Sequence, residues 1–212
     1  MHYSSQTMTL TTKVQYNELS KMSEKQKRIF FLTLALLSAV FFFGCSFMDS
    51  YGKIYRFEKN PFIFPDNLTI IKEGEIQAPW NRTDSLPLFV MYIDSMECTD
   101  CHLNHINYYN RLLEISKESQ KFDMICLISP SYAQHNSLPA KLLNSNRQTK
   151  ITYAIDNDCS CYDFNPCLPE LSKYHNFLLD RDGFPIYVGN PLKSEKLFNQ
   201  FLKLVLYKET NR

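Results

Sequence analysis

An uninterrupted apolar run that ends a few residues before two closely spaced cysteines constrains the fold of this chain more than any other feature. Residues 86–93 read LPLFVMYI, a run too short for a typical helix but suited to a central strand that is covered on both faces. Cys98 and Cys101 follow in a C-x-x-C pattern, and a helical spacing of apolar residues continues from Cys98 to about Ser119. We therefore expect Cys98 to lie where a buried strand gives way to a helix.

The order of the remaining elements indicates a mixed α/β domain. Strands are expected at residues 68–71, 86–93, 124–128, 151–155, 177–180 and 184–188, and helices at 98–119, at 131–148 and from Ser194 onward. The last two strands form a hairpin, because Gly183 can adopt the positive φ that a tight turn requires. The Ser194 hydroxyl can cap the final helix. After the lead-in strand, the order β-α-β-α-β-β-α predicts a central mixed sheet flanked by helices.

Length and charge narrow the classes of protein further. A chain of 212 residues suggests one domain of about 150 residues plus additional segments. Because 23 Lys and Arg residues balance 22 Asp and Glu residues, the net charge of +1 gives no basic field for nucleic acid. Nucleic-acid binding is therefore not expected, and we expect no bound cofactor.

The N-terminal part of the chain has the layout of a signal peptide. A nearly unbroken apolar run over residues 29–44 follows Lys25, Lys27 and Arg28, and polar residues follow Cys45. This run would span only about 24 Å as a helix, less than a stable membrane-spanning helix needs. We expect a polar extension over residues 1–21, a signal peptide over 22–45, a tether over 46–66 and a compact domain over 67–212. Met22 is an alternative start that would leave residues 1–21 untranslated.

The end of the apolar run also suggests attachment to a membrane. Gly44 and Cys45 resemble the end of a bacterial lipobox, in which the cysteine thiol receives a lipid, although Phe42 and Phe43 depart from the usual residues. A buried helix of a soluble protein is the other interpretation of residues 29–44, but the run lacks helical periodicity. We expect a protein that is exported to the bacterial cell envelope, faces the periplasm and is anchored through a lipid on Cys45.

The C-x-x-C pair predicts thiol-disulfide chemistry. Unpaired amides and the positive dipole end of a helix lower the pKa of a cysteine at its N-terminus, so Cys98 is the expected nucleophile. Cys101, one turn inward, would resolve the mixed disulfide. His102 can support the thiolate, whereas Glu97 and Asp100 oppose it by like charge, so we expect a reducing couple.

Three other interpretations of this pair remain open. Two cysteines in an exported chain can form a purely structural disulfide. With His102 the pattern is also C-x-x-C-H, the attachment motif of a c-type haem, although a cytochrome would be mainly helical. Cys98, Cys101 and a histidine could instead bind copper or zinc without turnover.

The chain has further cysteines beyond the C-x-x-C pair. Cys159, Cys161 and Cys167 follow the strand at 151–155, where two of them could close a disulfide or contribute to a metal site, and we favour the disulfide. Cys126 lies within a predicted strand and is expected to be buried and inert.

Several motifs taken together resemble the thioredoxin-like lipoproteins of bacterial envelopes. They are YIDS at 92–95, CTDC at 98–101, FLLDRDG at 177–183 and VGNP at 188–191, and the resemblance covers roughly residues 68–206. It implies a thioredoxin-like fold and a thiol-disulfide oxidoreductase. The implied partners are exported cysteine-containing proteins and an integral-membrane thiol that donates electrons. A non-catalytic scaffold with the same fold is the alternative.

Two departures from the resemblance bear on the site. Glu97 stands where many thioredoxins have a tryptophan before the first cysteine. His175 occupies the position at which thioredoxins place a cis-proline that faces the disulfide. We expect His175 to lie near the sulfurs and to donate a hydrogen bond or a proton there, the alternative being an edge-strand histidine that points to water.

Overall fold

The structure is a computed structural model that describes residues 23–77, 86–149 and 151–207, with the side chains of 35–50, 145–149 and 207 excluded. The expected polar extension over residues 1–21 and the side chain of Cys45 lie outside the described residues. The chain divides into two compact units, Met1–Ser50 and Tyr51–Arg212. Within the residues whose side chains the structure describes, no helical segment is both long and apolar enough to cross a membrane.

The expected tether over residues 46–66 differs from what the structure shows. Helix α2 covers Glu24–Lys59, so the chain stays helical well past the apolar run. Phe57 and Phe62 are only 2% and 4% exposed, and both rings contact Phe177 of the sheet at centroid distances of 5.1 and 5.0 Å. Because both aromatic rings are buried against the sheet, the packed domain begins near Tyr51 rather than after the expected tether.

Seven strands form one mixed sheet in the order β2-β1-β5-β4-β3-β6-β7. Their bounds are β1 Leu68–Lys72, β2 Glu75–Ile76, β3 Leu88–Ile93, β4 Asp123–Ile128, β5 Thr152–Asp156, β6 Asn176–Leu179 and β7 Pro185–Val188. Strand β4 runs parallel to β3 and β5, whereas β1 runs antiparallel to β5, β6 to β3 and β7 to β6. The predicted α/β class with a central mixed sheet is confirmed.

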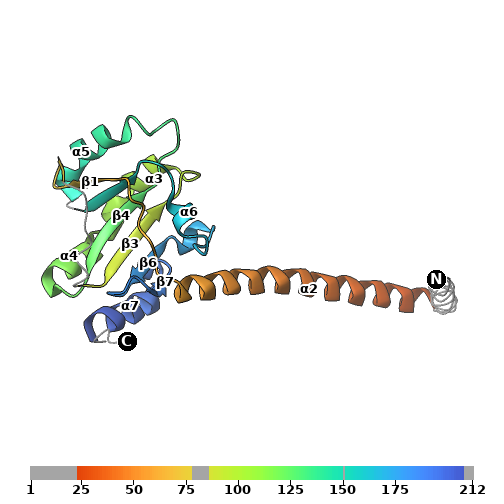
Figure 1. The fold of residues 1–212 in the computed structure, drawn as a ribbon. Coiled ribbons are helices and arrows are strands. Elements are labelled where there is room, and N and C mark those ends of the chain that lie inside the picture. The colour runs from red at the N-terminus through yellow and green to blue at the C-terminus, as the bar shows by residue number, and fades with distance from the viewer. Residues whose placement is uncertain (1–22, 78–85, 150, 208–212) are drawn as a thin grey trace, which may run out of the picture. The chain divides into compact units, whose positions relative to one another are not determined.

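Helices connect and cover these strands (Figure 1). After α2 they are α3 Thr99–Asn104, α4 Asn110–Ser119, α5 Leu138–Thr149, α6 Cys161–Phe164 and α7 Glu195–Tyr207, with 3₁₀ turns at Ile106–Tyr109, Ser172–Tyr174 and Pro191–Lys193. The single helix expected over 98–119 is interrupted at His105, and the helix expected from 131 begins only at Leu138. The predicted cap of α7 is confirmed, since the Leu197 amide donates to the Ser194 hydroxyl at 3.3 Å.

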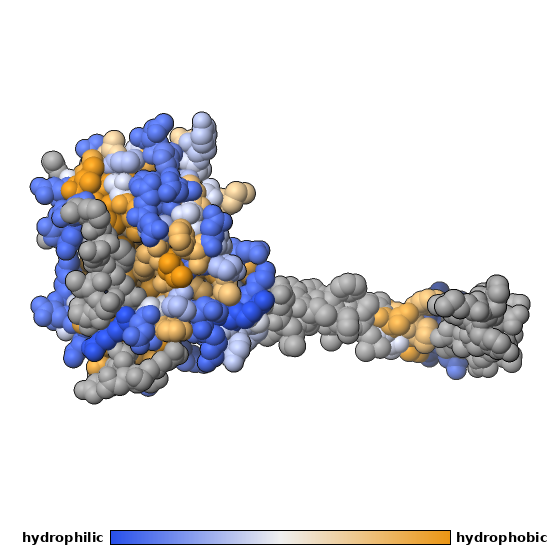
Figure 2. Space-filling model, in the orientation of Figure 1, coloured by the Kyte–Doolittle hydropathy of each residue, from blue (hydrophilic) through white to orange (hydrophobic). Residues whose placement is uncertain are grey.

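Alternate residues of the central strand β3 face two separate hydrophobic clusters, one on each side of the sheet. Phe89 and Met91 belong to the cluster covered by α4, α5 and α7, whereas Val90 and Tyr92 belong to the cluster covered by the end of α2 and by α6. Such burial on both faces is what the continuous apolar run predicts. Figure 2 shows mixed hydrophilic and hydrophobic residues on the viewed face of the second unit.

The predicted hairpin between β6 and β7 is also present. Gly183 has a φ of +89°, and the Asp180 carboxylate accepts hydrogen bonds from the amides of Asp182 and Phe184 at 3.0 and 2.8 Å. This turn returns the chain along β6 and leads it to α7. It thereby completes the strand pair beside β3, whose carboxyl end carries the cysteines.

Candidate functional site

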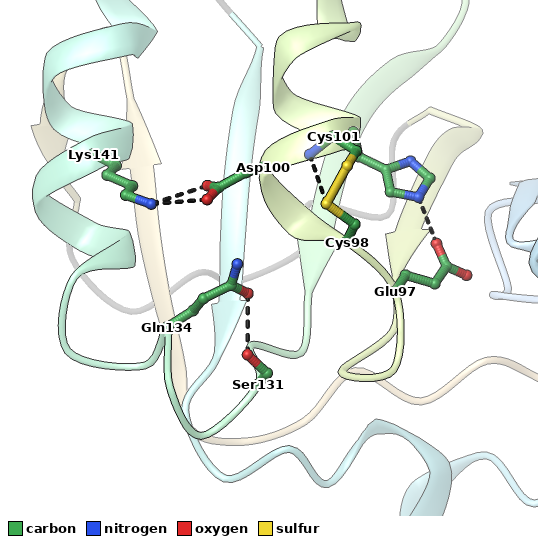
Figure 3. Close-up of a disulfide and its surroundings, with 8 residues drawn as sticks. Glu97, Cys98, Asp100, Cys101, Ser131, Gln134 and Lys141 are labelled. Carbon is green, nitrogen blue, oxygen red and sulfur yellow. Dashed lines mark hydrogen bonds and ion pairs between the residues drawn. A yellow bond between two sulfur atoms is a disulfide. The ribbon is translucent and has the colours of Figure 1, made fainter.

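Cys98 and Cys101 form a disulfide at the point where β3 leads into α3 (Figure 3). Their Cα atoms are 5.2 Å apart, and both residues are exposed to solvent. Cys98 is the N-cap of α3, because its Sγ accepts a hydrogen bond from the Cys101 amide at 3.3 Å. The position expected for Cys98 is therefore confirmed, whereas Cys101, expected one turn inward, also reaches the surface.

Glu97 precedes this disulfide and lies between two histidines from different elements. One carboxylate oxygen is 2.7 Å from Nε2 of His102 on α3, and the other accepts a hydrogen bond from Nδ1 of His175 at 2.8 Å. Figure 3 shows Glu97 on the side of the disulfide away from Asp100. From the sequence, Glu97 is expected only to oppose the thiolate by its charge, and no pattern indicates that two histidines contact this carboxylate.

The pKa values in this cluster follow from its pairing. Burial by itself raises the pKa of Glu97, but the close pairing with His102 and His175 and their positive charges outweigh it and lower the pKa to about 2. The ion pair with Glu97 at 2.7 Å, opposed by partial burial, raises the pKa of His102 above its ordinary value. Glu97 is therefore ionised at neutral pH, and the pairing favours the charged form of His102.

His175 is buried, with its side chain only 2% exposed, so the interpretation as an edge-strand histidine pointing to water is wrong. Its Nε2 lies 2.9 Å from the Pro169 carbonyl oxygen and 3.2 Å from the Tyr162 hydroxyl. Its own carbonyl accepts a hydrogen bond from the Tyr92 amide of β3 at 2.7 Å. His175 is thus linked to the cysteine pair by its contact with Glu97, the residue before Cys98.

Asp100 has a partner that the sequence did not indicate. Both of its carboxylate oxygens lie 3.0 Å from Nζ of Lys141 on α5, as Figure 3 shows. Each side chain in this pair is about half exposed, so the pair adds little stability, but it offsets the negative charge beside the disulfide. The like-charge opposition expected from Glu97 and Asp100 is therefore weakened at both residues.

The topology around the disulfide identifies the fold. Strands β4, β3, β6 and β7 are adjacent in that order, the first two are parallel, the last two form an antiparallel hairpin, and C-x-x-C follows β3. The fold is thioredoxin-like. No protein-family model matches the chain, and no curated protein matches its sequence.

A comparison with solved structures finds chains with partial backbone similarity. The thioredoxin-like chain resembles an uncharacterized thioredoxin-like protein from Porphyromonas gingivalis, with a TM-score of 0.46, 15% identity and coverage of 72% of this chain and 97% of the other. A thioredoxin-like protein from Aeropyrum pernix gives a TM-score of 0.41 with 13% identity and coverage of 65% and 88%. A mitochondrial 2-Cys peroxiredoxin from Plasmodium falciparum gives 0.46 with 10% identity and coverage of 72% and 98%.

The remaining described cysteines are free thiols, so the disulfide expected among the three cysteines after β5 is not formed in this thioredoxin-like domain. Cys161 is buried, and its amide donates to Asp156, whereas Cys159 is exposed and its thiol donates to the Pro130 carbonyl. Burial raises the pKa of Cys126 to about 12, as expected for an inert core thiol. Burial and the nearby carboxylates of Asp156 and Asp158 raise the pKa of Cys159 as well.

Within the part of the chain that the structure describes, no group of three or more His, Cys, Asp or Glu side chains is arranged to hold a metal ion. The site therefore consists of the exposed disulfide, Glu97 with its two histidines, and Asp100 with Lys141. Of the residues singled out from the sequence, Cys98, Cys101 and His102 share α3 and its N-terminus. His175 joins them through Glu97.

Proposed function

We propose that this thioredoxin-like chain is a thiol-disulfide oxidoreductase that reduces target disulfides, with Cys98 as nucleophile and Cys101 as resolving residue. The observation that carries the proposal is the exposed disulfide that caps α3. A purely structural disulfide gains nothing from a place at the surface, whereas an exchanging pair must be reached by its partner, and both cysteines are exposed residues.

The proposed reaction transfers two electrons from the dithiol to the target. The Cys98 thiolate attacks one sulfur of a target disulfide, the bond between the two target sulfurs breaks, and the departing sulfur takes up a proton. The Cys101 sulfur then loses its proton and attacks Cys98, which forms the Cys98–Cys101 disulfide and releases the second target thiol. A dithiol donor must reduce the disulfide again before the next cycle.

We further propose that the reaction takes place in the bacterial cell envelope, with the chain anchored through Cys45. The basic residues at 25–28, the apolar run and the lipobox-like ending support this location. Exported cysteine-containing proteins would be the targets, and an integral-membrane thiol carrier would supply electrons. Labelling cells with an alkyne fatty acid should mark the wild-type protein and leave Cys45→Ser unmarked; equal labelling of both would refute the anchor.

The exchange activity can be tested by insulin reduction. The full chain in mild detergent, supplied with dithiothreitol, should precipitate insulin faster than dithiothreitol alone, and Cys98→Ser should abolish the gain. Cys159→Ser, which alters an exposed free thiol, should retain it. A wild-type rate equal to that of dithiothreitol alone would contradict the proposal and favour a non-catalytic scaffold.

Trapping identifies the nucleophile and the targets together. Cys101→Ala should accumulate mixed disulfides on Cys98 that disappear on reduction, because the resolving sulfur is missing. The double variant Cys98→Ala/Cys101→Ala serves as the matched control and should form none. Adducts that persist in the double variant would show that another thiol is the attacking residue.

A further inference from the structure

Glu97 occupies an unexpected place for a carboxylate next to a nucleophilic sulfur. A lone negative charge there would disfavour the Cys98 thiolate. The Glu97 side chain is instead only 15% exposed, and both of its oxygens lie against imidazole nitrogens. The negative charge of Glu97 is therefore largely compensated by two histidines, which weakens its repulsion of a thiolate on Cys98.

His175 anchors Glu97 from the inside of the domain. Its Nδ1 faces the Glu97 carboxylate and its Nε2 faces the Pro169 carbonyl oxygen, and both of these groups can only accept hydrogen bonds. The Tyr162 hydroxyl, 3.2 Å from the same Nε2, is a third partner of the ring. A buried ring with hydrogen-bond partners at both nitrogens holds the carboxylate in one orientation.

His102 is the outer partner of Glu97 and the one close to the cysteines. Its amide donates to the Cys98 carbonyl at 3.1 Å, so the two residues are neighbours in the first turn of α3. Its side chain is 47% exposed, and its Nε2 is 2.7 Å from Glu97. Without Glu97, nothing among its described contacts would fix that ring.

We propose that Glu97 is a positioning residue of the exchange reaction: anchored by His175, it holds the imidazolium of His102 beside Cys98, where that positive charge stabilises the thiolate. This inference rests on the proposed function. The other titratable groups around the cluster are Tyr109 after α3, Tyr162 on α6 and Asp94 at the end of β3. Asp100 faces Lys141 instead.

The proposal predicts unequal effects of two substitutions on the pKa of Cys98 in the reduced protein. His102→Gln removes the positive charge and leaves Glu97, so the pKa of Cys98 should rise by roughly one unit. Glu97→Gln removes the negative charge and, above the ordinary pKa of histidine, most of the charge on His102 as well. The two losses offset each other, so Glu97→Gln alone should change the pKa of Cys98 little.

The decisive observation is non-additivity. The double variant Glu97→Gln/His102→Gln should behave like Glu97→Gln alone, because His102 carries little charge once Glu97 is gone. The pKa of Cys98 is measured on the reduced full chain as the pH dependence of thiolate absorbance at 240 nm, with alkylation mapped to Cys98. His105→Gln, which alters an exposed histidine at the end of α3, is the matched control and should leave the pKa unchanged.

A second measurement uses the wild-type chain and does not depend on the folding of a variant. The NMR titration of the His102 ring should give a higher pKa in the dithiol form than in the disulfide form, since the thiolate and the imidazolium stabilise each other. In Glu97→Gln the His102 pKa should fall toward its ordinary value. Additive effects of the two substitutions, or a His102 titration that is unchanged by reduction, would overturn the positioning role.

These readouts need no target disulfide, so they separate the two proposals. Coupled titration of His102 and Cys98 in a chain that fails to reduce insulin would refute the proposed function. It would still support the electrostatic effect of Glu97 and His102 on Cys98. Insulin reduction without that coupling would refute the positioning role alone.

Discussion

At the scale of single residues, charge next to the disulfide is governed by partners rather than by composition. The C-x-x-C segment carries two acids, and the sequence indicates only that both oppose a thiolate. In the fold, Glu97 contacts His102 and His175, and Asp100 contacts Lys141. Sequence spacing can pair only His102 with its acid, because His102 follows Glu97 closely in the chain. It cannot predict the contacts of His175 and Lys141.

Glu97 should also make stability depend on pH in the acidic range. Its pKa is lowered to about 2 in the fold, so its contribution is present above its ordinary pKa and is lost as the pH falls from about 4.5 toward 2. The free energy of unfolding of the oxidised chain, measured in urea, should decrease over that interval. Glu97→Gln should flatten this part of the profile, and an unchanged slope in the variant would contradict the lowered pKa.

At the scale of elements, the helix after the cysteines shows where local pattern and tertiary contacts disagree. Apolar spacing predicts one helix over 98–119, but α3 ends at Asn104 and a 3₁₀ turn follows. Asparagine is a weak helix former, and this stretch contains it at 104, 107 and 110. The Tyr109 hydroxyl, which donates to Asn176 of β6 at 2.9 Å, favours the break because it ties the turn to the sheet.

The cap of α7 belongs to the same scale and is testable. The Ser194 hydroxyl accepts a hydrogen bond from the Leu197 amide, one of the amides that the helix itself leaves free. Ser194→Ala should reduce the free energy of unfolding by about 1 kcal/mol, measured by urea denaturation. Ser194→Asp keeps an acceptor and should stay close to wild type; equal losses in both variants would show that the cap contributes nothing.

At the scale of the whole domain, the sheet is sandwiched between two hydrophobic clusters, and residues before β1 contribute to one of them. Phe57 contacts Phe62 and Phe177, with ring centroids 6.4 and 5.1 Å apart. The end of α2 is therefore part of the packed core of the second unit. A flexible tether would leave these rings exposed to water. Burying them against the sheet is more favourable, because it removes apolar surface from water.

Truncating this contact should destabilise the domain strongly. Phe57→Ala removes a side chain that is 2% exposed and should lower the free energy of unfolding by about 3 to 5 kcal/mol. Tyr55→Ala, two residues earlier on the same helix, removes a ring that is 62% exposed and should change it by less than about 1 kcal/mol. Similar values for the two variants would place the start of the packed domain after α2.

The sequence by itself determined the order of the main strands and helices along the chain, the hairpin at Gly183, the cap at Ser194 and the place of Cys98 at the start of a helix. These features follow from apolar periodicity and from residues whose backbone preferences are local. Only the tertiary structure decided that Glu97 meets His175, that Asp100 meets Lys141 and that Phe57 belongs to the core. Each of these contacts joins segments far apart in the chain, and no local preference encodes which distant side chain will fill the space beside a given residue.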